Sequence, residues 1–200
     1  SFAVFNFEAR SSYGIRVRTT DQGGQFFEQT FAITISDVNE SPTAVSFQNA
    51  TTSISENTST ASPIRLADIN FSDDALGTNL FSLSGADAVY FQIVGRELRL
   101  AVGTVFDFEA RSTFTVTVNV RDSGEGSTPS ASTNFTLTIT NINESPDRLG
   151  LSNAAMVENL PIGTVVGLLS SGDPDAGATF TYILVPGTGD ADNAAFRIAG

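Results

Sequence analysis

The hexapeptide Phe106-Asp107-Phe108-Glu109-Ala110-Arg111 closely repeats Phe5-Asn6-Phe7-Glu8-Ala9-Arg10, at a distance of 101 residues. Each copy is followed by a run in which apolar and polar residues alternate, and then by an Asp in a glycine-containing turn. Self-similarity at a fixed period indicates one structural unit that recurs along the chain. The sequence is therefore that of a repeat array.

Two further blocks recur with nearly the same period. The segment Asp37–Pro42 corresponds to Asn141–Pro146, and Glu56-Asn57 corresponds to Glu158-Asn159. A period of about 100 residues is the size of one small domain. We therefore expect the later part of a repeat in residues 1–41, a complete repeat in 42–145 and the earlier part of a third in 146–200, as in an excerpt from a longer protein.

The hydrophobic periodicity is that of β-strands. Phe114, Val116, Val118 and Val120 alternate with polar residues, which predicts strands with one buried and one solvated face. Clusters of Asp, Gly and Pro separate these runs as turns, and no window favours a helix. About seven short strands per repeat predict an all-β fold of tandem antiparallel β-sandwiches. The same alternation occurs at 31–35, 98–102, 135–139 and 179–184.

Composition excludes several functional classes. The chain has 22 acidic residues, ten Arg, no Lys and a net charge of −12, which disfavours nucleic acid as a partner. No Cys is present, so neither disulfides nor thiolate metal sites can form. The 200 residues contain no signal peptide and no apolar stretch of membrane-spanning length. Asn-x-Ser/Thr sequences, among them those at Asn49, Asn57, Asn70 and Asn134, are expected by chance in a chain rich in Ser and Thr.

The acidic residues occupy recurring places. Carboxylates within about 4–6 Å of one another repel unless a cation lies between them, so clustered acids favour a metal site. With no His and no Cys in the chain, the available ligands are hard oxygens, which select Ca²⁺ over zinc or copper. Taken singly, each acid has a simpler interpretation, because Asp122 fits an ordinary turn and Asp107 with Glu109 fits the solvated face of a strand.

Together these blocks resemble the cadherin repeat. The resemblance rests on five ordered elements: an early Glu-Asn, an Asp-x-Asp turn, a Leu-Asp-x-Glu segment, a late Asp before a Gly turn, and an Asp-x-Asn-Asp-Asn-x-Pro linker. Their counterparts are Glu56-Asn57, Asp173-Pro174-Asp175, Phe106–Glu109, Asp122, and the linkers 37–42 and 141–146. The linkers are one residue shorter than the family pattern, a form similar to bacterial cadherin-like repeats of large secreted or surface proteins. The resemblance implies a cadherin/immunoglobulin-like Greek-key sandwich.

The resemblance also implies Ca²⁺ ligands at the junctions between consecutive repeats. Three departures weaken the match, since Asn6 and Asn141 replace Asp and Asp73-Asp74 lacks a spacer. The ligands implied at the first junction are Asn6, Glu8, Asp37, Asn39, Glu40, Asp73, Asp74 and Asp122. Those implied at the second are Glu56, Asp107, Glu109, Asn141, Asn143, Glu144, Asp173 and Asp175.

The expected function is structural. Ca²⁺ would cancel repulsion between acids of neighbouring repeats and stiffen an extracellular adhesive array, whose partners are further repeats or copies of itself, with head-to-tail filaments as one possible assembly. Extracellular modules of this kind bind Ca²⁺ at about 10⁻⁴–10⁻³ M. An alternative is a Ca²⁺-assisted polysaccharide-binding module for cell-surface glycans, although Trp is absent and Tyr is rare. A glycosidase using Asp107 and Glu109 would lack facing carboxylates across a cleft, so no enzymatic activity is expected.

Overall fold

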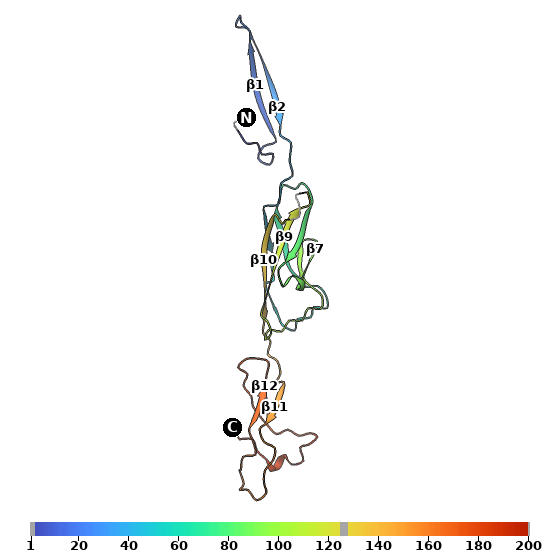
Figure 1. The fold of residues 1–200 in the computed structure, drawn as a ribbon, viewed down its shortest axis with the longest axis vertical. Coiled ribbons are helices and arrows are strands. Elements are labelled where there is room, and N and C mark those ends of the chain that lie inside the picture. Colours follow the sequence, from blue (N-terminus) through green and yellow to red (C-terminus); the bar gives the residue numbers. More distant parts are fainter. Residues whose placement is uncertain (1–2, 125–127, 200) are drawn as a thin grey trace. The chain divides into compact units, whose positions relative to one another are not determined.

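The computed structural model describes residues 3–124 and 128–199, and within them the chain is built of β-strands and loops (Figure 1). The only helical elements among these residues are two 3-10 turns, η1 (Ala88–Tyr90) and η2 (Asn193–Ala195). Neither could cross a membrane. The strands are β1 (Ser12–Thr20), β2 (Phe26–Thr34), β3 (Ala44–Gln48), β4 (Ser53–Ser55), β5 (Arg65–Ser72), β6 (Asn79–Ser84), β7 (Phe91–Val94), β8 (Glu97–Leu100), β9 (Thr113–Asp122), β10 (Ala131–Thr140), β11 (Arg148–Leu151) and β12 (Leu169–Gly172).

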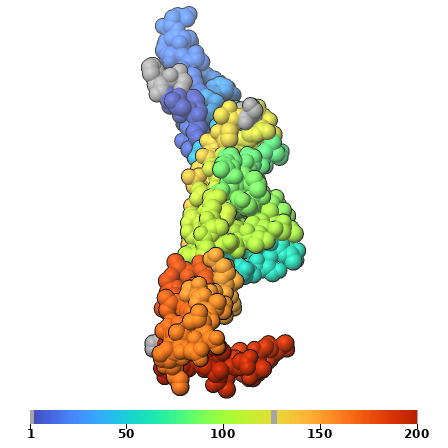
Figure 2. Space-filling model, turned by 60° about the horizontal axis from the view of Figure 1, so that its bottom comes forward, coloured from blue at the N-terminus to red at the C-terminus, as the bar shows by residue number. Residues whose placement is uncertain are grey.

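Two compact units divide the chain, and Figure 2 shows its surface coloured by residue number. The first unit takes in Ser1–Ile54, Thr58–Val105 and Thr113–Thr138. The second takes in Ser55–Asn57, Phe106–Ser112 and Ile139–Gly200. Each unit contains one group of the acidic residues that the sequence singles out, so each group can be described within its own unit.

The strands from β3 to β10 form two four-stranded sheets, in which the pairs β10-β9, β9-β6, β3-β5, β5-β8 and β8-β7 are antiparallel. One has the order β4-β10-β9-β6 and the other β3-β5-β8-β7. Ring contacts join the two sheets, since the Phe135 ring on β10 meets those of Phe47 on β3 and Phe91 on β7 edge to face, with centroids 5.2 and 6.4 Å apart. Such pairs stabilise a core beyond the area that they bury. The expected all-β sandwich fold is confirmed.

Alternation on β9 and β10 follows the sequence closely. Phe114, Val116, Val118 and Val120 are buried, and the register sets Val116 opposite Phe135. Successive residues of a strand point to opposite faces, so the intervening Thr and Asn side chains lie on the outer face of the sheet. The hydrophobic pattern therefore predicted both the strands and their orientation.

The repeats are visible in the backbone as well as in the sequence. Asn57 and Asn159 both have a positive φ, 57° and 65°, a conformation that Asn tolerates better than most residues. Each is preceded by a Glu of the recurring Glu-Asn pair. In both repeats, the Asn therefore turns the chain directly after the Glu.

The expected strand at 179–184 is absent from the structure. Figure 1 draws this stretch as coil, and no ladder partner lies opposite it among the described residues. The strand that corresponds to this stretch in the preceding repeat is β6, which pairs with β9 and places Leu83 opposite Val118. Alternation makes a segment competent for a sheet, but the hydrogen-bonded neighbour forms the strand. The strand expected at 98–102 also differs, because β8 ends at Leu100.

Candidate metal centres

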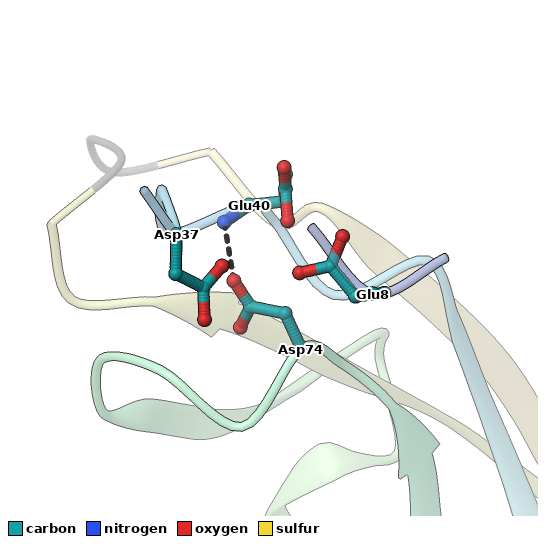
Figure 3. A group of neighbouring side chains, drawn as sticks. All are labelled: Glu8, Asp37, Glu40 and Asp74. Carbon is teal, nitrogen blue, oxygen red and sulfur yellow. Dashed lines mark hydrogen bonds between the residues drawn. The ribbon is translucent and has the colours of Figure 1, made fainter. Parts of the chain in front are cut away.

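Four carboxylates of the first unit come together (Figure 3). Glu8, Asp37, Glu40 and Asp74 each offer an oxygen, and these oxygens all lie within 4.8 Å of one another. Glu8 lies in the turn before β1, Asp37 and Glu40 in the extended segment after β2, and Asp74 in the loop after β5. We call this group cluster 1. Glu40 precedes Asp74 by 34 residues and Glu8 precedes it by 66, so the cluster joins distant parts of the sequence.

Backbone donors fix the position of Asp74. Its Oδ2 accepts a hydrogen bond of 2.8 Å from the Glu40 backbone N–H, and its Oδ1 accepts one of 2.9 Å from the N–H of Leu76. These donors lower the pKa of Asp74, because they stabilise its charged form. The charged form of Asp74 is therefore favoured beside Asp37 and Glu40.

A second set of oxygens meets at Gly77, also in the first unit. A Cβ added at Gly77 would lie 2.1 Å from Asp122 Oδ2 and 2.4 Å from Asn39 Oδ1. Both oxygens are buried and neither has a hydrogen-bond donor among the described residues; the Asp122 residue is only 1% exposed. The backbone N–H of Gly124 donates to Asp122 Oδ1 at 2.9 Å and lowers the pKa of that carboxyl. Contacts with the Asn39 side chain and the Thr78 backbone lower the pKa further and favour the charged form, while Oδ2 has no donor at hydrogen-bond geometry.

In the second unit, two acidic groups share Glu109. Glu56, Asp107 and Glu109 form one, Glu109, Glu144 and Asp175 form the other, and within each group the oxygens lie within 4.8 Å of one another. We call the five residues cluster 2. Glu109 is therefore the carboxylate that links the two groups.

Glu56 organises cluster 2 from a buried position. Only 2% of the residue is exposed, and its two oxygens accept hydrogen bonds from the N–H groups of Phe108 at 2.8 Å and Ile142 at 2.7 Å. It therefore holds the Phe-Asp-Phe-Glu segment beside the linker. Asp175 Oδ2 accepts the N–H of Glu144 at 2.7 Å, the same bond that Asp74 makes with Glu40 in cluster 1.

The electrostatics of both clusters are unfavourable without a cation. Loss of hydration raises the pKa of Glu40 and Glu144, and nearby carboxylates raise it further. Loss of hydration likewise raises the pKa of Glu109, with Glu56 adding to the effect. For Asp37, burial raises the pKa first, followed by a hydrogen bond and charge repulsion from Glu8. Acids with a raised pKa beside acids with a lowered one indicate crowding that a positive ion would relieve.

Several buried oxygens lack donors, which is unusual for folded proteins. Among the described residues, Asp37 Oδ1, Asp73 Oδ1 and Glu144 Oε2 are in this state, besides the two oxygens at Gly77. The donor set, made of carboxylate and amide oxygens, matches what Ca²⁺ takes. The residues present therefore fit a hard divalent cation.

Some expected ligands lie outside the two clusters. Asn6 uses its Oδ1 to accept the N–H of Ala9 at 2.6 Å, and Asn143 donates its Nδ2 to the Glu144 carbonyl at 2.7 Å. Asp173 Oδ1 accepts the Asp175 N–H at 3.0 Å, and Asp73 accepts a hydrogen bond from Asn79. Asn141 is exposed. Of these, only Asp73 keeps a buried oxygen without a donor.

Gly77 was not identified as a site residue from the sequence. A signal did exist, because the stretch Asp73-Asp74-Ala75-Leu76-Gly77 aligns with Asp173-Pro174-Asp175-Ala176-Gly177 and both glycines have a positive φ. A recurring Gly with positive φ is explained by a turn alone. Its second role, leaving space for two oxygens, depends on Asp122 and Asn39 and could not be read from local sequence.

Comparisons with known proteins point to one fold. No protein-family model matches the chain. Human protocadherin Fat 4 is 28% identical over 178 residues, which is 87% of this chain and 4% of that protein. Human protocadherin gamma-A4 is 29% identical over 192 residues, which is 92% of this chain and 20% of that protein. The chain thus spans a small part of the curated relatives that it matches.

Solved structures agree with these sequence relatives. The extracellular cadherin domains 1–5 of protocadherin gamma B2 superpose with a TM-score of 0.66 at 17% identity, covering 88% of this chain and 34% of that one. The protocadherin gamma B7 EC3-6 cis-dimer structure gives a TM-score of 0.61 at 23% identity, covering 88% of this chain and 43% of that one. The chain has the fold of cadherin extracellular repeats.

These relatives bear on three earlier expectations. They are non-enzymatic adhesion proteins of the cell surface, which supports an extracellular location and agrees with the expectation of no enzymatic activity. The expected bacterial type of repeat finds no support, because the relatives named here are animal protocadherins.

Replacing Gly77 tests the oxygen pair. We expect Gly77→Ala to lower the free energy of unfolding more than Gly103→Ala, as measured by urea denaturation of the 200-residue chain. Gly103 has a similar φ, 79° against 72°, but a Cβ there meets nothing within 4 Å, so only the backbone strain of roughly 1–2 kcal/mol applies. Equal losses in the two variants would contradict the close approach of Asp122 and Asn39 to Gly77.

The crowded acids predict an inverse pH dependence without metal. In excess chelator, the midpoint of thermal unfolding should rise as the pH falls from neutral towards the ordinary pKa of Asp and Glu. The pKa values of Asp37, Glu40, Glu109 and Glu144 are raised in the folded state, so this state binds more protons than the unfolded chain and its stability falls with rising pH.

The same carboxyls supply the control for that experiment. Glu109→Gln removes one titrating group and should flatten the dependence in the second unit. The lowered pKa values of Asp74 and Asp122 act in the opposite direction, since their contribution is lost only when the pH falls through those values. A midpoint that drops steadily on mild acidification would show that the four carboxyls are not crowded.

Proposed function

We propose that this chain is a Ca²⁺-stabilised segment of an extracellular adhesive array built from cadherin-like repeats. The observation that carries the proposal is the convergence of Glu8, Asp37, Glu40 and Asp74, whose oxygens lie within 4.8 Å of one another. A protein that gathers four carboxylates so closely disfavours its own folded state unless a cation compensates the charge. The fold shared with cadherin ectodomains supports this function.

The ligands proposed for each centre follow from the clusters. Glu8, Asp37, Glu40 and Asp74 would hold Ca²⁺ in the first unit, with Asn39 and Asp122 supplying the oxygens at Gly77. In the second unit, the five acids of cluster 2 would serve. Asn6, Asp73, Asn141, Asn143 and Asp173 remain proposed outer ligands, through a second oxygen, a backbone carbonyl or a bound water.

Ca²⁺ would act here by charge compensation and bracing. We propose repeats with boundaries at 1–41, 42–145 and 146–200, so that each centre draws on residues from both sides of a linker proline, Pro42 or Pro146. A cation bound to both sides would restrict the linker, which converts a flexible string into a stiffer one. Millimolar extracellular Ca²⁺ suits sites of about 10⁻⁴–10⁻³ M affinity.

The partners proposed are further repeats of the same protein or other copies of it. One of the similar structures is described as a cis-dimer, which concerns that protocadherin and suggests self-association as the first possibility to test here. Polysaccharide binding is not favoured, because sugars usually stack on exposed Trp or Tyr side chains and the chain contains no Trp and only three Tyr. Adhesion through protein contacts is therefore the proposal that we carry forward.

Calcium binding is tested by stability. At 5 mM Ca²⁺, sites of the expected affinity should raise the free energy of unfolding by about 1–2 kcal/mol each over the chelated chain. Glu109→Gln should remove the gain of the second unit, because Glu109 belongs to both groups of cluster 2. Asp192→Asn is the matched control, since Asp192 is exposed and lies outside both clusters. A Mg²⁺ response equal to that of Ca²⁺, or the absence of any Ca²⁺ response, would refute selective Ca²⁺ sites.

Stiffening of the linkers by Ca²⁺ can be measured separately from Ca²⁺ binding. Small-angle scattering of the 200-residue chain should give a narrower range of end-to-end distances in Ca²⁺ than in chelator, and Asp74→Asn should abolish the difference that arises at the first linker. The substitution removes one charge, and the single amide oxygen of Asn can accept only one of the two backbone N–H groups, of Glu40 and Leu76, that Asp74 accepts. Identical scattering in both conditions, with Ca²⁺ bound, would separate binding from mechanics and reject the bracing role.

A further inference from the structure

Six Asn-x-Ser/Thr sequences occur in the chain, and they are potential acceptors for N-linked sugars. The sugar is attached to the side-chain Nδ2. A folded protein can carry it only where that nitrogen reaches solvent and is not needed for an internal hydrogen bond. The structure therefore separates sequences that match by chance from one that can be used. The six acceptors are Asn39, Asn49, Asn57, Asn70, Asn134 and Asn143.

Three of the six use Nδ2 as an internal donor. Asn49 donates to Asp68 Oδ2 at 2.8 Å, Asn57 to Glu144 Oε1 at 3.4 Å, and Asn143 to the Glu144 carbonyl at 2.7 Å. Asn49 also adopts a positive φ of 49°, which fixes its backbone in a turn. A sugar on any of these nitrogens would displace a contact of the folded chain.

Two more are sterically unsuitable. The Nδ2 of Asn70 is buried, so a glycan there would have to pass through the fold. Asn39 is half-buried and lies against Gly77 with its Oδ1 buried, within the proposed metal centre of the first unit. Neither nitrogen offers the open path that a bulky oligosaccharide requires.

Asn134 differs from all of these. It lies on β10 with its side chain exposed, opposite Thr117 on β9. Thr117 donates its hydroxyl to Asn134 Oδ1 at 2.8 Å, which orients the amide through its oxygen and leaves Nδ2 without a hydrogen bond in the described part of the chain. The buried Phe135 anchors the strand, and Thr136 follows on the same outer face.

The surroundings of Asn134 suit a neutral sugar. The outer face carries no charged side chain between Thr113 and Asn119 on β9 or between Ser132 and Thr138 on β10. In a chain of net charge −12, this face is a neutral surface of hydroxyl and amide groups. An oligosaccharide resting on it would form hydrogen bonds without removing water from a carboxylate.

We propose that Asn134 is an acceptor of an N-linked oligosaccharide. In the transfer, Nδ2 forms a bond to the anomeric carbon of a polyprenyl-diphosphate-linked sugar. The C–O bond to the diphosphate breaks, the diphosphate leaves with the electron pair, and the amide loses one proton. The inference requires only passage through a secretory pathway that holds this donor. It is independent of the proposed Ca²⁺ sites.

The test uses the whole 200-residue chain, secreted from cultured animal cells behind a cleavable leader. Intact mass before and after peptide N-glycosidase treatment, with peptide mapping, should give one glycan, located by conversion of Asn134 to Asp. Asn134→Gln and Thr136→Ala should both remove it. Thr136→Ser should retain it, because the hydroxyl is kept, and Asn49→Gln should leave the mass of the glycan unchanged.

The variants also guard against a folding artefact. Thr136→Ala and Thr136→Ser change the same exposed side chain, so loss of the glycan in the first with retention in the second identifies sequon use rather than poor secretion. Secreted chain with Asn134 unmodified would overturn the proposal. A glycan found on Asn49, Asn57 or Asn70 instead of Asn134 would overturn it too, since it would show that solvent access of Nδ2 does not govern the choice.

Discussion

Repulsion among carboxylates is the constraint on which the rest of this structure depends. Cluster 1 and cluster 2 bring acids from distant parts of the sequence to within 4.8 Å of one another, and several of their oxygens are buried without a donor. Loss of hydration opposes charge on Glu40, Glu109 and Glu144, whereas backbone donors keep Asp74 and Asp122 ionised. Protonation would relieve part of this conflict, and the bound hard cation that we propose would compensate the charge of the clustered oxygens.

The fold positions these acids through a small set of backbone hydrogen bonds that recur from one repeat to the next. Glu40 N–H donates to Asp74, and Glu144 N–H donates to Asp175 in the same way. This correspondence explains the missing spacer in Asp73-Asp74, because Asp74 takes the role of Asp175 directly. Asp73 instead accepts a hydrogen bond from Asn79, the first residue of β6. The departure from the family pattern changes the loop without removing the carboxylate that the linker needs.

The sequence predicted the structure well wherever a single local requirement, such as burial of one strand face, decides the conformation. Alternation of Val and Phe with Thr predicted β9 and β10, since burial of one face is enough to order such a segment beside a neighbour. It failed at 179–184, where alternation is present but a hydrogen-bonded neighbour is not. The acidic groups were predictable because their blocks recur, whereas the cradle at Gly77 was not, because it depends on Asp122 and Asn39 approaching from other segments.

One Asp can serve both as a turn residue and as a metal ligand, because its carboxylate has two oxygens that can take different partners. Asp122 gives Oδ1 to the N–H of Gly124 and keeps Oδ2 buried beside Gly77, so one side chain both closes a turn and remains available to a cation. Asp107 likewise uses Oδ1 for the N–H of Ala110 and still joins Glu56 and Glu109. Asn6 makes the matching bond to Ala9 with its only oxygen. It has no second side-chain oxygen and no charge to contribute, so the first unit lacks the carboxylate that Asp107 gives to the second.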